Sequence, residues 1–231
     1  PFTIKYSKEW FDDTVSKVTS VLNSTIPIFA NHAHATVRKA CAAFSATVLE
    51  HCKETLPESQ RILLETLLSL SNDSWELVSA FAKGEIDHLK EKNLIPLEMI
   101  KVILKADLGF DSTTSKSFSS FFYQENEMRL LATIDLLGGD ETSHLLLSST
   151  STRRELVHAL AQRAQSKILL RKIGAVANPK FFELLINDVV TSISSFQHEA
   201  IATYVFIANE ILRGATSSEN VSSKKVALNL I

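Results

Sequence analysis

Residues 26–44 read IPIFANHAHATVRKACAAF, and this stretch decides the fold. The apolar residues that lead into it recur at steps of three and four, which is typical of one face of an amphipathic helix. They are Phe11, Val15, Val18, Leu22, Ile26 and Phe29. After a short polar loop a second stripe of the same kind begins, formed by Val37, Cys41, Phe44, Val48 and Cys52. The sequence therefore predicts two helices, over 8–30 and 35–53, joined as a hairpin.

The same arrangement recurs downstream. A second pair of helices is predicted over 57–70 and 74–91, and aligning Asn31 with Asn72 brings Val37 onto Val78. This shift of 41 residues lies within the ~40–47 residues of HEAT and armadillo repeats. One hairpin cannot cover its own apolar face, so hairpins of this kind stack and share a core. The sequence predicts an all-α fold, an α-α superhelix of HEAT-like hairpins.

The rest of the chain continues the helical pattern. Glycine and proline are scarce, at 6 and 5 residues, which argues against all-β and Rossmann-like folds. Further helices are predicted over 96–106, 118–137, 141–149, 152–165, 179–195 and 197–213. Segment 164–178 is left open, either as a helix of the stack or as a bridging segment. We expect one repeat domain over 1–213 and a polar linker and tail over 214–231.

Several helix ends carry recognisable chemistry. Thr152 and Glu155 have the spacing of a capping box. Asn178 before Pro179 is a cap followed by a proline suited to a first turn. Gly214 is predicted to end the last helix, because glycine is the usual residue where a helix ends in a left-handed conformation.

The stretch quoted above resembles HEAT repeats, with Pro27 in the first helix and Val37-Arg38 at the start of the second. In that family a loop aspartate and the arginine after the valine tend to form a ladder between neighbouring repeats. Here the motif is split. The first hairpin has Arg38 but His32 in the aspartate position, and the second has Asp73 but Ser79 in the arginine position. The resemblance implies an inter-repeat contact between Arg38 and Asp73; a solvated arginine and a plain helix-capping aspartate are the alternatives.

A narrower resemblance covers three segments in order along the chain: Trp10 to Leu70, MRLLATIDLLGGD (128–140) and ATYVFIANEILRGA (202–215). They are similar to the Tel-interacting HEAT-repeat scaffold subunits (Tti-one) of the TTT co-chaperone complex. The resemblance implies a scaffold, working in a hetero-oligomer with Tel and Tti-two type subunits and the chaperone machinery, that supports assembly of phosphatidylinositol-3-kinase-like kinases. Chains of that family are longer, so this sequence is expected to be a fragment.

The charge balance and the cysteines limit which classes of partner and which cellular compartment fit this chain. Lys+Arg number 24 against Asp+Glu 26, so the chain lacks the basic excess of a nucleic-acid binder. No run approaches the ~18 apolar residues of a membrane span. If Cys41 and Cys52 share a helix they lie about 16 Å apart along its axis, too far for a disulfide. Two free thiols favour the cytoplasm or the nucleus.

A search for reactive groups favours a non-enzymatic protein without catalytic, cofactor or metal residues. His32 and His34 could bind zinc, but no third ligand has suitable spacing, and loop histidines that cap the next helix are the simpler interpretation. Adjacent Asp87 and His88 diverge on a helix, and burial should make Cys41 inert. Alternatives are a karyopherin-like transport protein or another HEAT adaptor, and, in a different class, a helical enzyme domain.

Aromatic residues supply the remaining candidates for a binding surface. Trp10, Trp75 and the cluster Phe118, Phe121, Phe122 and Tyr123 are interpreted first as core. Any of them that stays exposed would be a candidate anchor for a partner, because aromatic side chains dominate interface hot spots.

Overall fold

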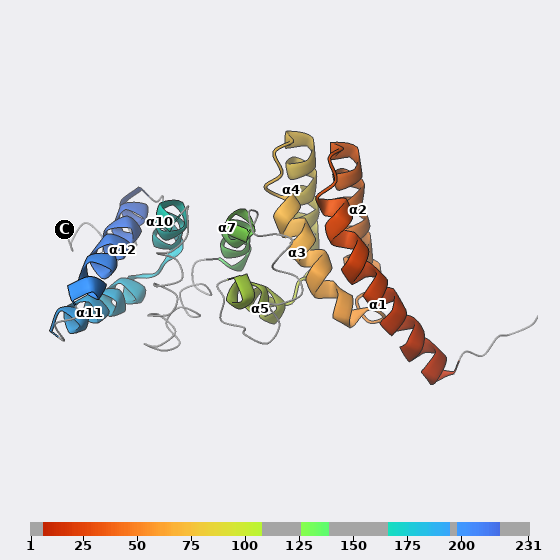
Figure 1. The fold of residues 1–231 in the computed structure, drawn as a ribbon, viewed down its shortest axis with the longest axis horizontal. Helices are drawn as coiled ribbons and strands as arrows, with labels where there is room; N and C mark the ends of the chain where they lie inside the picture. Colours follow the sequence, from red (N-terminus) through yellow and green to blue (C-terminus); the bar gives the residue numbers. More distant parts are fainter. Residues whose placement is uncertain (1–6, 108–125, 139–165, 195–197, 218–231) are drawn as a thin grey trace, which may run out of the picture. The chain divides into compact units, whose positions relative to one another are not determined.

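The computed structural model describes residues 7–107, 126–138, 166–194 and 198–217, and the regular elements in these ranges are helices (Figure 1). They fall into two compact units, Pro1–Met99 and Ile100–Ile231. The predicted all-α fold is confirmed for the described residues. The single repeat domain over 1–213 stays a prediction.

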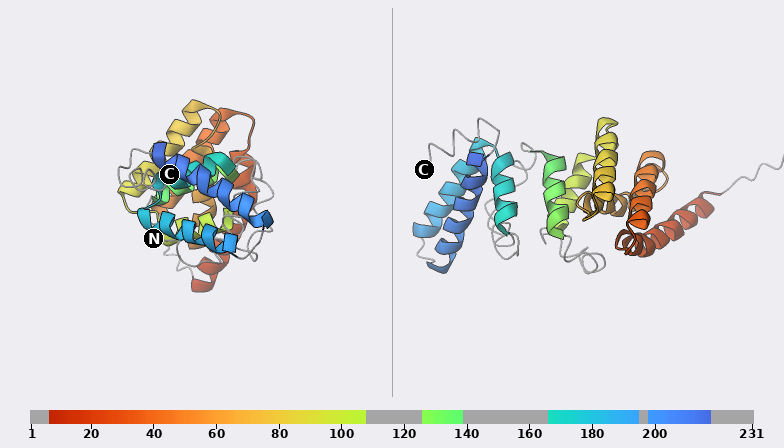
Figure 2. Two further views of the ribbon diagram at one scale, coloured as in Figure 1. Left: turned by 90° about the vertical axis from the view of Figure 1, so that its left-hand side faces the viewer. Right: turned by 90° about the horizontal axis from the view of Figure 1, so that it is seen from above.

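Two helical hairpins make up the first unit. One consists of α1 (Lys8–Ala30) and α2 (Ala35–His51). The other consists of the 3-10 turn η1 (Pro57–Ser59), α3 (Gln60–Leu70) and α4 (Glu76–Glu91). The start of α1 extends past the other helices of this unit (Figures 1 and 2). The bounds of α1 to α4 confirm the four helices predicted from the apolar stripes, with ends that differ by a few residues.

Helix α3 is the centre of the first unit. Every residue from Ile62 to Leu70 is buried, and α3 is contacted by α1, α2 and α4. Full burial of each leucine in this helix contributes about 1.5–3 kcal/mol relative to exposure. Two of its buried polar side chains bond within the helix: Thr66 Oγ1 donates to the Ile62 carbonyl at 2.7 Å, and Glu65 Oε1 accepts from Arg61 Nε at 2.8 Å. The apolar run therefore forms the core on which both hairpins pack.

Side chains just before a helix fix where α1 and α4 begin. Ser7 Oγ accepts from the backbone N–H of Trp10 at 3.1 Å, a standard N-terminal cap. Helix α4 begins at Glu76, two residues later than predicted. The reason is that Trp75 is extended, with its N–H bonded to Asp73 Oδ1 at 2.8 Å.

The second unit contains α7 (Asn126–Leu137), α10 (Ser166–Val176), α11 (Pro179–Ser194) and α12 (His198–Ser217). Helix α5 (Leu97–Asp107) crosses the boundary between the units. Helix α12 packs against α10 and α11 (Figure 1). The open question about 164–178 is thus answered for most of its length, because α10 is a helix packed against its neighbours.

The second unit contains a buried ion pair and a capped helix start. Asp107, at the end of α5, and Arg129, in α7, form a buried bidentate ion pair whose Nε–Oδ2 distance is 2.9 Å. Asn178 Oδ1 accepts from the N–H of Phe181 at 3.1 Å, which confirms the predicted cap of α11.

The prediction that the last helix ends at Gly214 is wrong, because α12 continues to Ser217. Gly214 instead allows α12 to approach α10. A Cβ atom on Gly214 would lie 1.9 Å from the Arg171 carbonyl oxygen, and one on Gly174 would lie 1.9 Å from that of Ile211. The two glycines are therefore needed where the helices cross, and the first residues of the expected tail, 214–217, are helical.

Several predictions fall outside the described residues. These are the helices over 141–149 and 152–165, the first part of the helix over 118–137, the capping pair Thr152 and Glu155, and the aromatic cluster Phe118, Phe121, Phe122 and Tyr123. In the part of the chain that the structure describes, no helix is long and apolar enough to cross a membrane.

Candidate functional site

Arg38 and Asp73, the two residues chosen from the sequence, lie in contact in the first unit. Arg38 is in the first turn of α2, and Asp73 is in the loop between α3 and α4. Arg38 Nε lies 2.5 Å from Asp73 Oδ2, and Nη2 lies 2.8 Å from Oδ1. Such a bidentate pair fixes orientation as well as supplying charge. The structure therefore brings these two residues together across the contact between the hairpins.

Each partner also makes a second set of contacts. Arg38 Nη1 donates to the carbonyl oxygens of His32 at 2.7 Å and Ala33 at 3.0 Å, in the α1–α2 loop. Asp73 Oδ1 accepts from the N–H of Trp75, at the start of α4. Asp73 is thus both the acceptor for the N–H of Trp75, just before α4, and an ion-pair partner. The Arg38 guanidinium joins the loops of the two hairpins at one point.

The environment keeps Asp73 ionised. Burial raises the pKa of this carboxyl, but the hydrogen bonds from Arg38 and from the Trp75 N–H, with the charge of Arg38, outweigh burial and lower it below its usual range. The side chains of Arg38 and Asp73 are 12% and 6% exposed, so the pair is shielded from most of the solvent screening that weakens surface ion pairs.

His32 occupies the place in the first hairpin that Asp73 occupies in the second. Its Nδ1 accepts from the N–H of His34 at 3.1 Å, the same two-residue step as the bond from Trp75 to Asp73. The rings of His32 and His34 lie 5.4 Å apart. Among the described residues, no three His, Cys, Asp or Glu side chains are grouped so that they could hold a metal ion. His32 therefore bonds within the loop, whereas α2 begins without a side-chain cap, so the predicted capping of this helix by a loop histidine is wrong.

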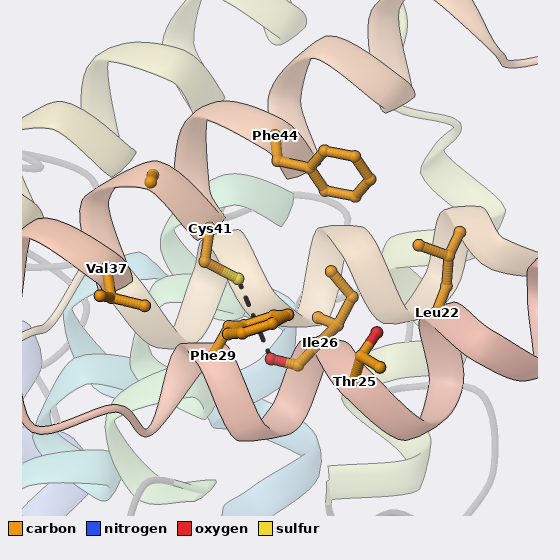
Figure 3. Close-up of a pocket in the computed structure, with 8 residues that line it drawn as sticks. Leu22, Thr25, Ile26, Phe29, Val37, Cys41 and Phe44 are labelled. Carbon is orange, nitrogen blue, oxygen red and sulfur yellow. Dashed lines mark hydrogen bonds between the residues drawn. The ribbon is translucent and has the colours of Figure 1, made fainter.

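An apolar groove lies between α1 and α2 (Figure 3). Its volume is about 330 Å³, and its lining residues are Leu22, Thr25, Ile26, Phe29, Val37, Ala40, Cys41 and Phe44. Phe29 and Phe44 are 47% and 46% exposed, unusually high values for aromatic side chains placed on an apolar stripe. The groove can therefore bury apolar surface of a partner, with two aromatic rings at hand as anchors.

The groove contains a thiol that burial keeps neutral. Cys41 Sγ points from α2 towards the Ile26 carbonyl of α1, at 3.9 Å (Figure 3). Burial raises the pKa of Cys41 to about 11. A neutral thiol is a poor nucleophile. The chemistry available in the groove is apolar contact.

Exposed tryptophans offer a second kind of anchor. Trp10 near the start of α1 and Trp75 before α4 are 47% and 59% exposed, and Leu77 beside the latter is more exposed still. These two tryptophans meet the condition stated for candidate anchors, namely that they stay accessible.

Sequence reasoning placed Phe29 and Phe44 in the core and missed the groove. A position-by-position comparison of the two hairpins would have found it, because Phe44 falls on the charged Glu85.

Stacked helical hairpins whose loops are joined by an ion pair are the architecture of a helical-repeat scaffold. Comparison with known families agrees for the N-terminal part. Residues 2–74 match the family model described as the TTI1 N-terminal TPR domain. This segment contains α1, α2, α3, both residues of the ion pair and the whole groove.

The match confirms the resemblance to Tel-interacting scaffold subunits for this segment, and the further similar segments at 128–140 and 202–215 lie outside it. The family description names TPR repeats, whereas the hairpins here recur at 41 residues instead of the ~34 of a TPR. No curated protein and no solved structure matched the chain.

Proposed function

We propose that this chain is a non-enzymatic scaffold that binds other proteins and works as part of a TTT-type co-chaperone assembly. In that assembly it would support folding and assembly of phosphatidylinositol-3-kinase-like kinases, with Tel and Tti-two type subunits and the chaperone machinery as its partners. The match of residues 2–74 to the TTI1 N-terminal domain is the observation that carries this proposal.

The geometry of the first unit supports a binding role. The groove between α1 and α2 has an apolar lining and a neutral thiol. An arrangement of this kind buries apolar surface of a protein partner, as interface cores do. The two free cysteines favour a reducing compartment, so we place the scaffold in the cytoplasm, the nucleus or both.

The test is an affinity capture of the tagged chain from cell lysate, with the captured proteins identified by mass spectrometry. Recovery of Tel-type subunits or of kinase clients is the expected result. Recovery of nuclear-pore and cargo proteins would favour the karyopherin-like alternative and overturn the co-chaperone proposal. Failure to recover either group would also count against a partner site within these residues.

A matched pair of variants makes the capture specific to the groove. Phe44→Asp places a charge in the groove, and Val190→Asp places the same charge on an exposed apolar residue of α11. Both side chains are about half exposed, so each variant should keep its fold, which circular dichroism checks. Loss of partners with Phe44→Asp but not with Val190→Asp assigns the binding to the groove.

A further inference from the structure

The two hairpins of the first unit can be compared residue by residue. The shift of 41 residues carries the eight groove residues onto Leu63, Thr66, Leu67, Leu70, Val78, Phe81, Ala82 and Glu85. Three of the pairs are identical: Leu22 with Leu63, Thr25 with Thr66, and Val37 with Val78. The groove of the first hairpin and this face of the second are therefore the same face of one repeat.

In the second hairpin this face is covered. The counterparts of the groove residues on α3 are at most 3% exposed, and so are Val78 and Ala82 on α4. Helix α2, which packs against both α3 and α4, supplies part of the cover, and α1 also packs against α3. The Lys39 ammonium of α2 lies 5.0 Å from the centre of the Phe81 ring, and Phe81 is the counterpart of Ala40. The second helix of a neighbouring hairpin is thus what this face of the repeat takes.

The covering helix has a definite chemistry. Cys41 of α2 points towards α1, and the other buried residues of α2 are Ala42, Ser45, Ala46 and Leu49, mostly small side chains that allow close approach. At two equivalent positions, the first hairpin has Phe29 and Phe44 and the second has Leu70 and Glu85. The groove is therefore more apolar than its covered counterpart, and a helix with a small and apolar face fits it.

The α1–α2 loop, beside the groove, offers a hydrogen-bond donor at the position where the α3–α4 loop offers an acceptor. Asp73 accepts hydrogen bonds, and the guanidinium of Arg38 on the covering helix supplies them. His32 uses Nδ1 as an acceptor for the His34 N–H, which leaves Nε2 as the ring atom that can donate. His32 can donate from that atom, and an arginine is the wrong partner for a donor.

We propose that the α1–α2 groove binds the second helix of a helical hairpin of a partner protein. That helix would place small and apolar residues on Phe29 and Phe44, and a carboxylate, where α2 has Arg38, beside His32. This inference rests on the proposed scaffold function, because it names the class of partner that the groove takes.

The test uses the full chain and two fluorescent peptides. Both carry residues 35–51, the sequence of α2, with Cys41→Ala, and with Thr36→Lys and Ala40→Glu condensed into a side-chain lactam that holds the helix. One peptide keeps Arg38 and the other carries Arg38→Glu. Fluorescence anisotropy measures the binding of each peptide to the chain and to its variants.

The glutamate peptide is expected to bind the natural chain roughly tenfold more tightly than the arginine peptide. A His32→Asp variant of the chain should reverse this preference, because it rebuilds the ion pair of the second hairpin. Phe44→Asp should abolish binding of both peptides, and Val190→Asp should leave it unchanged.

Other outcomes overturn the inference. These are no binding of either peptide at about 1 mM, binding that Phe44→Asp does not weaken, or a preference that His32→Asp does not alter. Sedimentation of the chain alone tests another occupant: a dimer that Phe44→Asp dissociates would show that a second copy covers the groove. If the peptides fail while the capture of Tel-type partners succeeds, the scaffold function stands and its binding face lies elsewhere.

Discussion

Arg38 and Asp73 are 35 residues apart in the sequence and are joined by two hydrogen bonds of 2.5 and 2.8 Å. Arg38 also holds two carbonyl groups of its own hairpin loop, and Asp73 holds the start of α4. One ion pair therefore sets the position of the second hairpin relative to the first at the loop end of the stack. Along the helices, the packing of α2 against α3 and α4 sets the relative position of the two hairpins.

Removing the guanidinium should be costly. Arg38→Ala leaves the shielded carboxylate of Asp73 without its charged partner and frees two loop carbonyls, so we expect a loss of about 2–3 kcal/mol in the free energy of unfolding. Urea denaturation measures it. The control is Lys17→Ala, which removes an exposed ion pair with Asp13 and should cost less than about 0.5 kcal/mol. Equal losses for the two variants would contradict the structural role of Arg38.

The contribution of Asp73 should depend on pH. Its folded-state pKa lies below its unfolded value of about 3.9, so the stability it supplies is present above that value and is lost as pH falls through the folded pKa. Asp73→Asn should therefore destabilise the chain at pH 6, and the difference from the natural chain should shrink towards pH 3. Urea denaturation at several pH values tests this. A difference that stays constant from pH 6 to pH 3 would show that the charge of Asp73 is not what matters.

Two glycines within helices should respond to alanine with opposite signs. At Gly214 the new Cβ would lie 1.9 Å from the Arg171 carbonyl, so α12 must move away from α10. We expect a loss of about 1–3 kcal/mol or more. At Gly84, in α4, no atom lies within 4 Å of the new Cβ, and alanine should stabilise by about 0.5–1 kcal/mol. Thermal unfolding of both variants measures the two changes in stability. If Gly214→Ala stabilised the chain, the close crossing of α10 and α12 would be excluded.

Equivalent positions of the two repeats should differ in cost. Leu70 is 3% exposed and covered by the first hairpin, so Leu70→Ala should lower the free energy of unfolding by about 2–4 kcal/mol. Phe29, its counterpart 41 residues earlier, is 47% exposed, and Phe29→Ala should cost about 1 kcal/mol despite the larger side chain. Chemical denaturation compares them. A cost at Phe29 as large as at Leu70 would mean that the groove is covered in solution.

The positions and types of most described helices could be predicted from the sequence. Apolar spacing is a local property, and each helix shows its buried stripe whatever lies against it. The cap at Asn178 was predictable for the same reason, since a cap depends only on residues within one turn. The 41-residue shift also predicted the hairpins, because one repeat copies the local pattern of the other.

Only the tertiary structure decided what covers each stripe. Phe44 and Leu67 both lie on apolar stripes, yet one is half exposed and the other fully buried, because a neighbouring hairpin covers only the second. Gly214 suggested a helix end in the sequence, whereas the carbonyl of Arg171, 43 residues earlier, explains it. Periodicity determines which side of a helix is apolar, but the partner of that side comes from distant parts of the chain or from another molecule.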